Sequence, residues 1–144
     1  MKGGAGMGER MRGNEYRTTT VCVDSYKNGL PVGRFYNPAC PKGIAFQSLS
    51  QLLVKLQNFL DGMQFPQAFT LTRAFSPREP EAGMDWVSPE ARRTGALATF
   101  DVRILFRQNS SWQGSVLWQE GDREESFRSV LELVLLMDSA MDGQ

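Results

Sequence analysis

The stretch that decides the fold is "FDVRILFRQNSSWQGSVLW", residues 100–118. Apolar residues from Phe100 to Phe106 alternate with mostly polar ones, and this period of two predicts a half-buried β-strand. A second alternating run, from Trp112 to Trp118, follows Asn109, a residue type that tolerates the positive φ of a tight turn. The stretch therefore predicts an antiparallel hairpin centred on Asn109.

The register of this hairpin follows from its two apolar sets, because directly opposed residues of an antiparallel pair share one face. The sets meet on one face only when the opposed pairs are Phe106 with Trp112, Ile104 with Gly114, Val102 with Val116, and Phe100 with Trp118. We expect an aromatic pair at each end of this apolar face, with Gly114 leaving room in the middle.

A helix is predicted after the hairpin. Arg123 to Glu125 suit a short third strand, Ser126 is the expected N-cap, and the helix is expected from Phe127 to Met141. Its central run "VLELVLLM" is apolar almost all round, which indicates burial on more than one side. The second side would contact either the other helix of the chain or a second copy, giving a homodimer through helix 127–141.

The same pattern occurs earlier in the chain, at an offset of 81, and we call positions related by this offset equivalent. Identical residues align without a gap at Thr18 and Thr99, Val21 and Val102, Asn28 and Asn109, Gly33 and Gly114, Phe46 and Phe127, Ser48 and Ser129, Leu52 and Leu133, Asp61 and Asp142, and Gly62 and Gly143. These identities fall at a hairpin tip, a strand glycine and the two ends of a helix, where local structure is demanding. The helix of the first copy is expected from Phe46 to Leu60. We interpret the pattern as an internal duplication.

These elements predict an α+β fold, in which a β-β-β-α unit is duplicated at this offset and an antiparallel sheet packs on two helices. Residues 1–17 are glycine-rich and polar, and we expect them to be disordered. The rest is expected to form a single domain, residues 18–144, made of repeat unit 18–62, connecting segment 63–97 and repeat unit 98–144. The proline-rich, charged connecting segment indicates a loop, in which Trp86 either anchors the chain or binds a partner.

The composition excludes several kinds of chemistry. The chain has 144 residues and no histidine, which removes catalytic triads, histidine general bases and histidine-ligated zinc. Two cysteines alone cannot hold a zinc ion, and the acidic side chains around the third strand suit a helix entrance better than an acid/base pair. We therefore expect no enzyme activity, no metal and no cofactor.

Charge and hydropathy bound the location and the partner. Sixteen basic residues balance sixteen acidic ones, so no global field attracts nucleic acid. No apolar run reaches the length of a membrane span, and the N-terminus lacks the apolar core of a signal peptide. We expect a cytoplasmic protein that does not associate with membranes.

The string "NSSWQG" (residues 109–114) is similar to the N-x-S-x-x-G motif of PilZ domains, which bind cyclic di-GMP. Arg103 and Arg107 also give the R-x-x-x-R spacing of that family. The likeness implies a cyclic-dinucleotide sensor, but it covers barely a dozen residues and places both arginines within a strand. The first copy keeps Asn28 and Gly33 without the serine or the arginines, so turn geometry and packing are the simpler explanation.

The remaining candidate site is the sheet face opposite the aromatic one. Its mixture of arginine, tyrosine, glutamine and leucine is typical of a binding surface. The candidate partner-binding residues are Arg103, Arg107, Gln113, Leu117, Tyr26, Arg34 and Tyr36, together with Trp86 of the connecting segment. A protein is the expected partner. Nucleic acid is the alternative, because some DNA-binding modules lay such a sheet in a groove, although so few arginines supply few phosphate contacts.

The second copy, from "FRQNSSWQG" through "ESFRSVLEL" to "MDSAM" (residues 106–141), resembles a group of small uncharacterised bacterial proteins. These proteins come from gut-type bacteria and their mobile elements, and they share a FRQN-x-SWQG hairpin and an ESFRS-x-LEL helix start. The resemblance implies a bacterial accessory protein and, as one option, an anti-defence or regulatory factor of a mobile element. It brings no catalytic residues with it.

Overall fold

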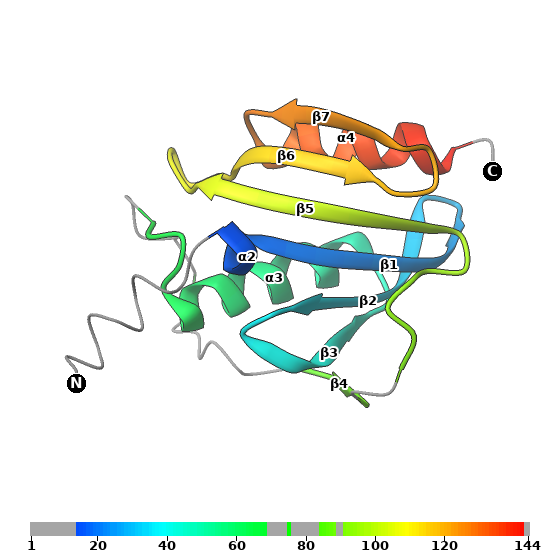
Figure 1. Cartoon of the computed structure of the whole chain (residues 1–144), viewed down its shortest axis with the longest axis horizontal. Helices are drawn as coiled ribbons and strands as arrows, with labels where there is room; N and C mark the ends of the chain where they lie inside the picture. The colour runs from blue at the N-terminus through cyan, green and yellow to red at the C-terminus, as the bar shows by residue number, and fades with distance from the viewer. Residues whose placement is uncertain (1–13, 69–74, 76–83, 89–90, 143–144) are drawn as a thin grey trace.

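The computed structural model describes residues 14–68, 75, 84–88 and 91–142. The fold is α+β, with seven strands in one antiparallel sheet and three helices among the described residues (Figure 1). The strands are β1 (Thr18–Lys27), β2 (Leu30–Asn37), β3 (Cys40–Phe46), β4 (Trp86–Val87), β5 (Ala98–Phe106), β6 (Gln113–Trp118) and β7 (Arg123–Phe127), and the helices are α2 (Asn14–Arg17), α3 (Leu49–Met63) and α4 (Val130–Met141). Across the sheet the order is β4-β3-β2-β1-β5-β6-β7.

The centre of the sheet is the antiparallel pair β1–β5. Thr20 lies directly opposite its equivalent Asp101, and its hydroxyl donates a 2.8 Å hydrogen bond to the Asp101 carboxylate. Each centre strand then pairs with its own hairpin partner, β2 or β6, and these pair with β3 and β7. On one side of the central pair the order is β1-β2-β3, and on the other side it is β5-β6-β7, so the two sides have the same arrangement.

Turns with left-handed backbone close the two central hairpins. Asn28 has a φ of 56° between β1 and β2, and Asn109 has a φ of 57° between β5 and β6. Asparagine adopts this conformation more readily than other side chains, so the predicted positive φ is confirmed at both residues. The sheet register also confirms the predicted pairs Phe100–Trp118, Val102–Val116 and Ile104–Gly114.

A β-bulge changes the last predicted pair of the hairpin. The β5–β6 register shifts between Ile104 and Phe106, and β1 shifts at the equivalent place, between Val23 and Ser25. The prediction that Phe106 opposes Trp112 is wrong, because Phe106 pairs with Gln113 and its side chain is 52% exposed. One extra residue in a strand reverses the alternation of faces beyond it. Residues after the bulge therefore lie on the face opposite to the predicted one.

Both long helices begin at a serine cap. The Ser48 hydroxyl accepts the backbone N–H of Gln51, and the Ser129 hydroxyl accepts that of Glu132. This side-chain acceptor satisfies one of the donors that a helix N-terminus leaves free. The predicted cap Ser126 is wrong, since Ser126 belongs to β7, and both helices start about one turn later than predicted.

The core lies on one face of the sheet, on the side of the long helices. α3 contacts β2 and β3, α4 contacts β5, β6 and β7, and Figure 1 shows both helices behind the sheet. The largest fully buried side chains include Phe35, Ile44, Phe46, Leu56, Leu60, Phe100, Ile104 and Phe127. Removal of this apolar surface from water is the main favourable contribution to folding.

The outer face of α4 differs from its prediction. Leu133 and Met137 are buried, but Leu131 is 65% exposed and Leu135 is 56% exposed. Within this chain the helix is therefore buried on one side, not on two. No helix in the described ranges is long and apolar enough to cross a membrane.

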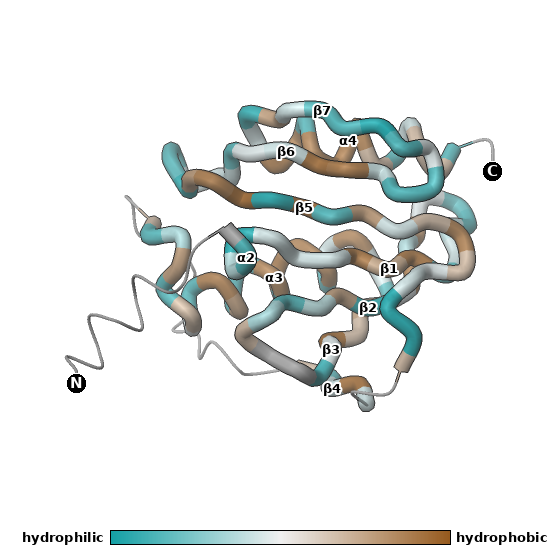
Figure 2. Tube along the Cα trace, viewed as in Figure 1, coloured by the Kyte–Doolittle hydropathy of each residue, from teal (hydrophilic) through white to brown (hydrophobic). Residues whose placement is uncertain are grey.

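The two sheet edges are protected differently. β7 is one edge strand, and Figure 2 shows hydrophilic residues along most of it, from Arg123 to Glu125. Charged side chains on an edge strand disfavour pairing with another chain. The other edge is β4, which is only two residues long and pairs with Gly43 and Ile44.

Two predicted segments are described only in part. Most of the predicted disordered segment, residues 1–17, lies outside the described residues, but residues 14–17 form α2 and Arg17 donates a 2.6 Å hydrogen bond to the Leu105 carbonyl. The connecting segment 63–97 contributes the end of α3, the edge strand β4 and a final stretch, residues 91–97, that packs against the sheet.

Candidate functional site

The sheet face that points away from the helices is covered in its first half by residues 91–97. Arg34 of β2 holds this stretch: its Nη2 donates to the carbonyls of Arg92 at 2.6 Å and Thr94 at 3.0 Å. Its Nη1 forms a 2.8 Å ion pair with Asp24 of β1. Ala96 donates its backbone N–H to the same Asp24. Arg34 therefore holds residues 91–97 against the sheet, although its sequence position suggested a partner-binding residue.

The covering stretch also buries Tyr36 and Cys22. Tyr36 is 3% exposed, and the guanidinium of Arg93 lies 4.3 Å above its ring centre. Cys22 is fully buried, and this burial raises the pKa of its thiol to about 11. Gly95 fits closely here, since a Cβ on it would lie 2.4 Å from the carbonyl oxygen of Val23. The first half of this face is thus closed by the chain itself.

The second half of the same face is open. We call it the open patch and define it by Arg103, Leu105, Phe106, Gln113 and Leu117 of β5 and β6. Phe106 is 52% exposed, and the other members are partly exposed. In register, Arg103 lies between Thr18 of β1 and Ser115 of β6, at the middle of this surface.

Arg103 has an unsatisfied group. Its Nε is buried, yet it has no hydrogen-bond partner within the described residues. An unmet buried N–H costs roughly 1–3 kcal/mol, so such groups are rare in folded proteins. The charged residues that lie near Arg103 in the register are acidic. Asp101 lies two positions before Arg103 on β5, and Glu124 on β7 lies across Leu117 of β6 from Asp101. Asp101 is engaged by Thr20 and by Gln119.

Gln113 has a local structural role at the edge of the open patch. Its side-chain amide donates to the Gln108 carbonyl and its oxygen accepts the Gln108 N–H, both at 2.9 Å. These two bonds brace the β5–β6 turn. They lie next to Phe106, with which Gln113 pairs.

Two of the predicted surface residues lie on the helix side instead. Beyond its bulge β5 turns Arg107 inward, where it is 3% exposed, forms a 2.7 Å ion pair with Asp61 of α3 and donates from Nε to the Pro66 carbonyl. Tyr26, at the equivalent position of β1, donates its hydroxyl to Asp138 of α4. That hydrogen bond raises the pKa of Tyr26 to about 12.

These two contacts cross between the halves of the fold. The tip of the first hairpin is fixed to α4 by Tyr26, and the tip of the second is fixed to α3 by Arg107. Trp112 adds a third crossing contact, donating its indole N–H to the Gln57 side chain of α3 at 2.8 Å. The prediction that Arg107 and Tyr26 lie on the open face is therefore wrong, and the bulges are the reason.

Trp86 is the last predicted site residue. It lies in the short edge strand β4, opposite Ile44, and is 46% exposed. The neighbouring Asp85 forms a 2.9 Å ion pair with Lys55 of α3. Trp86 is thus far from the open patch in strand order, at the opposite edge of the sheet.

Sequence reasoning brought Arg103, Gln113 and Leu117 together correctly and missed Phe106. The bulge that exposes Phe106 has no signature in the apolar alternation, because the residues on both sides of it are apolar. Within the described residues, no three histidine, cysteine, aspartate or glutamate side chains are placed to hold a metal ion. Known proteins offer no guide, since no family model, curated protein or solved structure matches the chain.

Proposed function

We propose that the protein is a non-enzymatic binding protein that recognises a protein partner through the open patch. The observation that carries this proposal is the unmet Nε of Arg103 at the centre of an otherwise partly apolar surface. Arginine anchors surrounded by apolar contacts are frequent hot spots of protein interfaces. A carboxylate or carbonyl of a partner would bond to the guanidinium as the Arg103 side chain turns outward and exposes its Nε, and Phe106 and Leu117 would become buried.

The charge on this face favours a protein over nucleic acid. Asp101 and Glu124 flank Leu117, so Arg103 is outnumbered by carboxylates on its own surface. Phosphate binding relies on several cations, and its strength falls steeply with salt. The cyclic-dinucleotide alternative needs two accessible arginines, whereas Arg107 is 3% exposed and paired with Asp61.

The groups with shifted pKa values support a non-enzymatic role. Burial raises the pKa of Cys22, the bond to Asp138 raises that of Tyr26, and hydrogen bonds from Arg128 lower that of Glu132 to about 2. Tyr26 and Glu132 each make a structural hydrogen bond, and Cys22 is closed off beneath residues 91–97. A cytoplasmic accessory role in a bacterium, including anti-defence or regulatory work for a mobile element, is the setting that we propose from the resemblance of the second copy.

The test compares the wild-type protein with Arg103→Ala and Phe106→Ser as affinity baits in extract of the native cell. Leu30→Ser is the matched control, since Leu30 is 53% exposed at the other hairpin tip and Phe106 is 52% exposed. We expect one protein to bind the wild type and Leu30→Ser, and to bind the purified variants at least ten-fold more weakly. Equal binding by all four proteins would overturn the proposal.

Two further measurements separate the alternatives. If labelled DNA or RNA bound to the wild type, with an affinity that falls steeply between about 50 and 200 mM salt and is lost in Arg103→Ala, nucleic acid would replace protein as the partner. A thermal shift with cyclic di-GMP at millimolar concentration would favour the sensor. Turnover of a metabolite by the purified protein would remove the non-enzyme proposal.

A second copy of the chain is the second candidate partner, through the outer face of α4. The observation that favours it is the exposed apolar pair Leu131 and Leu135, one helical turn apart on that face. We expect a dimer in sedimentation equilibrium at about 100 µM, which Leu135→Glu converts to monomer. Val54→Glu is the matched control, because Val54 is the equivalent of Leu135 on α3 and is 40% exposed. A monomeric wild type would exclude the dimer.

We also propose that the fold is a tandem duplication of a β-β-β-α unit whose two helices pack on one sheet. Support comes from details shared at equivalent positions: serine caps, left-handed asparagines, bulges and the central pair Thr20–Asp101. Gly33 and Gly114 give the closest match. A Cβ on either would lie 1.8 Å from a carbonyl oxygen of the neighbouring strand, on Cys22 and Arg103 respectively.

A further inference from the structure

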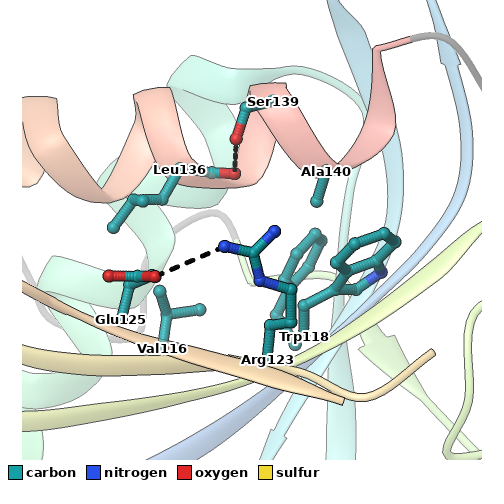
Figure 3. A pocket seen from close by; sticks show the side chains of 8 residues that line it. Val116, Trp118, Arg123, Glu125, Leu136, Ser139 and Ala140 are labelled. Atoms are coloured by element: carbon teal, nitrogen blue, oxygen red, sulfur yellow. Dashed lines mark hydrogen bonds and ion pairs between the residues drawn. The ribbon is translucent and has the colours of Figure 1, made fainter. Parts of the chain in front are cut away.

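A second site lies on the other side of the sheet, between α4 and strands β5 to β7. It is an open-mouthed cavity of about 170 Å³ (Figure 3). Its apolar lining comes from Phe100, Val116, Trp118, Leu136 and Ala140, and its polar lining from Arg123, Glu125 and Ser139. The cavity is separate from the open patch, because Val116 and Trp118 point to the helix side of the sheet.

At the corresponding place in the first half two phenyl rings pack together. The residue equivalent to Ala140 is Phe59, and the residue equivalent to Val116 is Phe35. Phe59 and Phe35 pack edge to face, with their ring centres 6.3 Å apart. The second half has an alanine and a valine where the first half has two phenyl rings. The second half has its own rings elsewhere in the lining, because Phe100 and Trp118 stand where the first half has Thr19 and Asn37. The apolar lining of the cavity is therefore redistributed rather than copied from the first half.

The mouth of the cavity carries one charge of each sign. Arg123 and Glu125 lie on β7 with their charged atoms 3.7 Å apart, and Figure 3 shows both side chains between the strand and α4. Their side chains are 72% and 55% exposed, so this ion pair is weak and its members can turn to a ligand at little cost. Ser139 is less free, because its hydroxyl donates to the Leu136 carbonyl.

We propose that this cavity binds an apolar α-amino acid, with its side chain between Val116 and Ala140, its carboxylate on Arg123 and its ammonium on Glu125. An apolar cavity of about 150 Å³ holds a benzene ring, so the available volume suits a phenyl or branched aliphatic side chain. A ligand with a carboxylate alone would face repulsion from Glu125, and one with an ammonium alone would face Arg123. Only a zwitterion complements both.

The test is a titration of the full-length protein, followed by amide NMR shifts, with four probes. These are L-phenylalanine, phenylacetate without the ammonium, phenethylamine without the carboxylate, and glycine without the side chain. We expect L-phenylalanine to bind with a dissociation constant near about 1 mM, as a ligand of about a dozen heavy atoms should, and the other probes at least five-fold more weakly.

Two variants locate the site. Ala140→Phe restores the ring that the first half has and should abolish binding, whereas Arg123→Gln should weaken L-phenylalanine at least five-fold without weakening phenethylamine. Arg128→Gln is the control, since Arg128 is exposed and paired with Glu132 away from the cavity. No binding of L-phenylalanine in the millimolar range, equal binding of phenylacetate, or full binding by a folded Ala140→Phe protein would each overturn the proposal. If Ala140→Phe does not fold, the Arg123→Gln result alone decides.

Discussion

The buried ion pair Arg107–Asp61 leads to an asymmetric prediction for its two partners. The Arg107 side chain is 4% exposed, whereas that of Asp61 is 39% exposed. Asp61→Ala leaves the guanidinium charge buried; among the described residues, the Pro66 carbonyl is the hydrogen-bond acceptor that remains, bonded to its Nε. Arg107→Met removes the charge itself, fills a similar volume and leaves Asp61 able to hydrate.

The magnitudes follow from this difference in burial. Removal of one partner from a fully buried pair costs about 3–5 kcal/mol, and the partial exposure of Asp61 reduces that to roughly 2–3 kcal/mol for Asp61→Ala. Arg107→Met leaves the Pro66 carbonyl without its donor, which costs about 1–2 kcal/mol. The double variant has no buried charge left without a partner. Its loss of stability should therefore equal that of Arg107→Met rather than the sum of the two single losses.

Urea unfolding followed by tryptophan fluorescence measures these free energies. The matched control is Asp142→Ala, because Asp142 is the equivalent of Asp61 in the second copy and is exposed, so its loss should change the free energy of unfolding by less than about 0.5 kcal/mol. The reasoning is refuted if Asp61→Ala costs less than Arg107→Met, or if the double variant is as unstable as the two single costs added.

Three further outcomes are expected. Gly33→Ala and Gly114→Ala should each cost more than about 3 kcal/mol in urea unfolding, because the new Cβ would lie 1.8 Å from a backbone oxygen; a tolerated substitution at either would contradict the close strand approach. The pKa of Tyr26 is raised from 10 to about 12, so the folded state favours the neutral phenol: its contribution is complete below pH 10 and is lost as the pH rises towards 12. Tyr26→Phe should therefore lose less stability than the wild type between pH 10 and 12 in urea unfolding, and identical curves would refute this. In a Cys40→Ser background, the Cys22 thiol should react with a disulfide reagent only as fast as the covering stretch 91–97 opens, and reaction at the rate of a free thiol would contradict its burial.

The sheet was the most predictable part of the molecule, and the prediction of its register failed at one place only, the end of the β5–β6 hairpin. Alternation and an asparagine turn were enough for the pairs from Phe100–Trp118 to Ile104–Gly114. They failed at Phe106 because a bulge inserts a residue without interrupting the apolar run.

The helix start was predictable from a signal that the prediction passed over. Ser129 and Glu132 form the S-x-x-E pattern of a capping box, and Ser48 and Gln51 form its S-x-x-Q equivalent. Glu132 also accepts the backbone N–H of Arg128, the residue before the cap, whereas a standard capping box bonds the N–H of the cap residue itself. The apolar phenylalanine before each serine made the earlier start attractive, but that residue ends a strand.

The closed half of the outer sheet face was beyond sequence reasoning. Arg34 donates hydrogen bonds to the backbone carbonyls of Arg92 and Thr94. Every residue type has such a carbonyl, so the identity of residues 92 and 94 gives no sign of the contact. The connecting segment has no period that places it on a sheet. Because that contact was invisible, Tyr36 and Arg34 were indistinguishable from Arg103 and Leu117 as candidate binding residues.

Comparison of the two halves supports our proposal that the protein binds its partner at the open patch. The residues that are identical at equivalent positions of the two halves lie at turns, caps, close strand approaches and in the core, where they serve the fold. The two halves differ along the outer face, for example at Cys22 against Arg103, Ser25 against Phe106, and Tyr36 against Leu117. The first half covers its face with its own chain, and the second presents a half-exposed phenylalanine beside an arginine with an unmet N–H. A partner bound at that surface would cover the outer face of the second half, as residues 91–97 cover the outer face of the first.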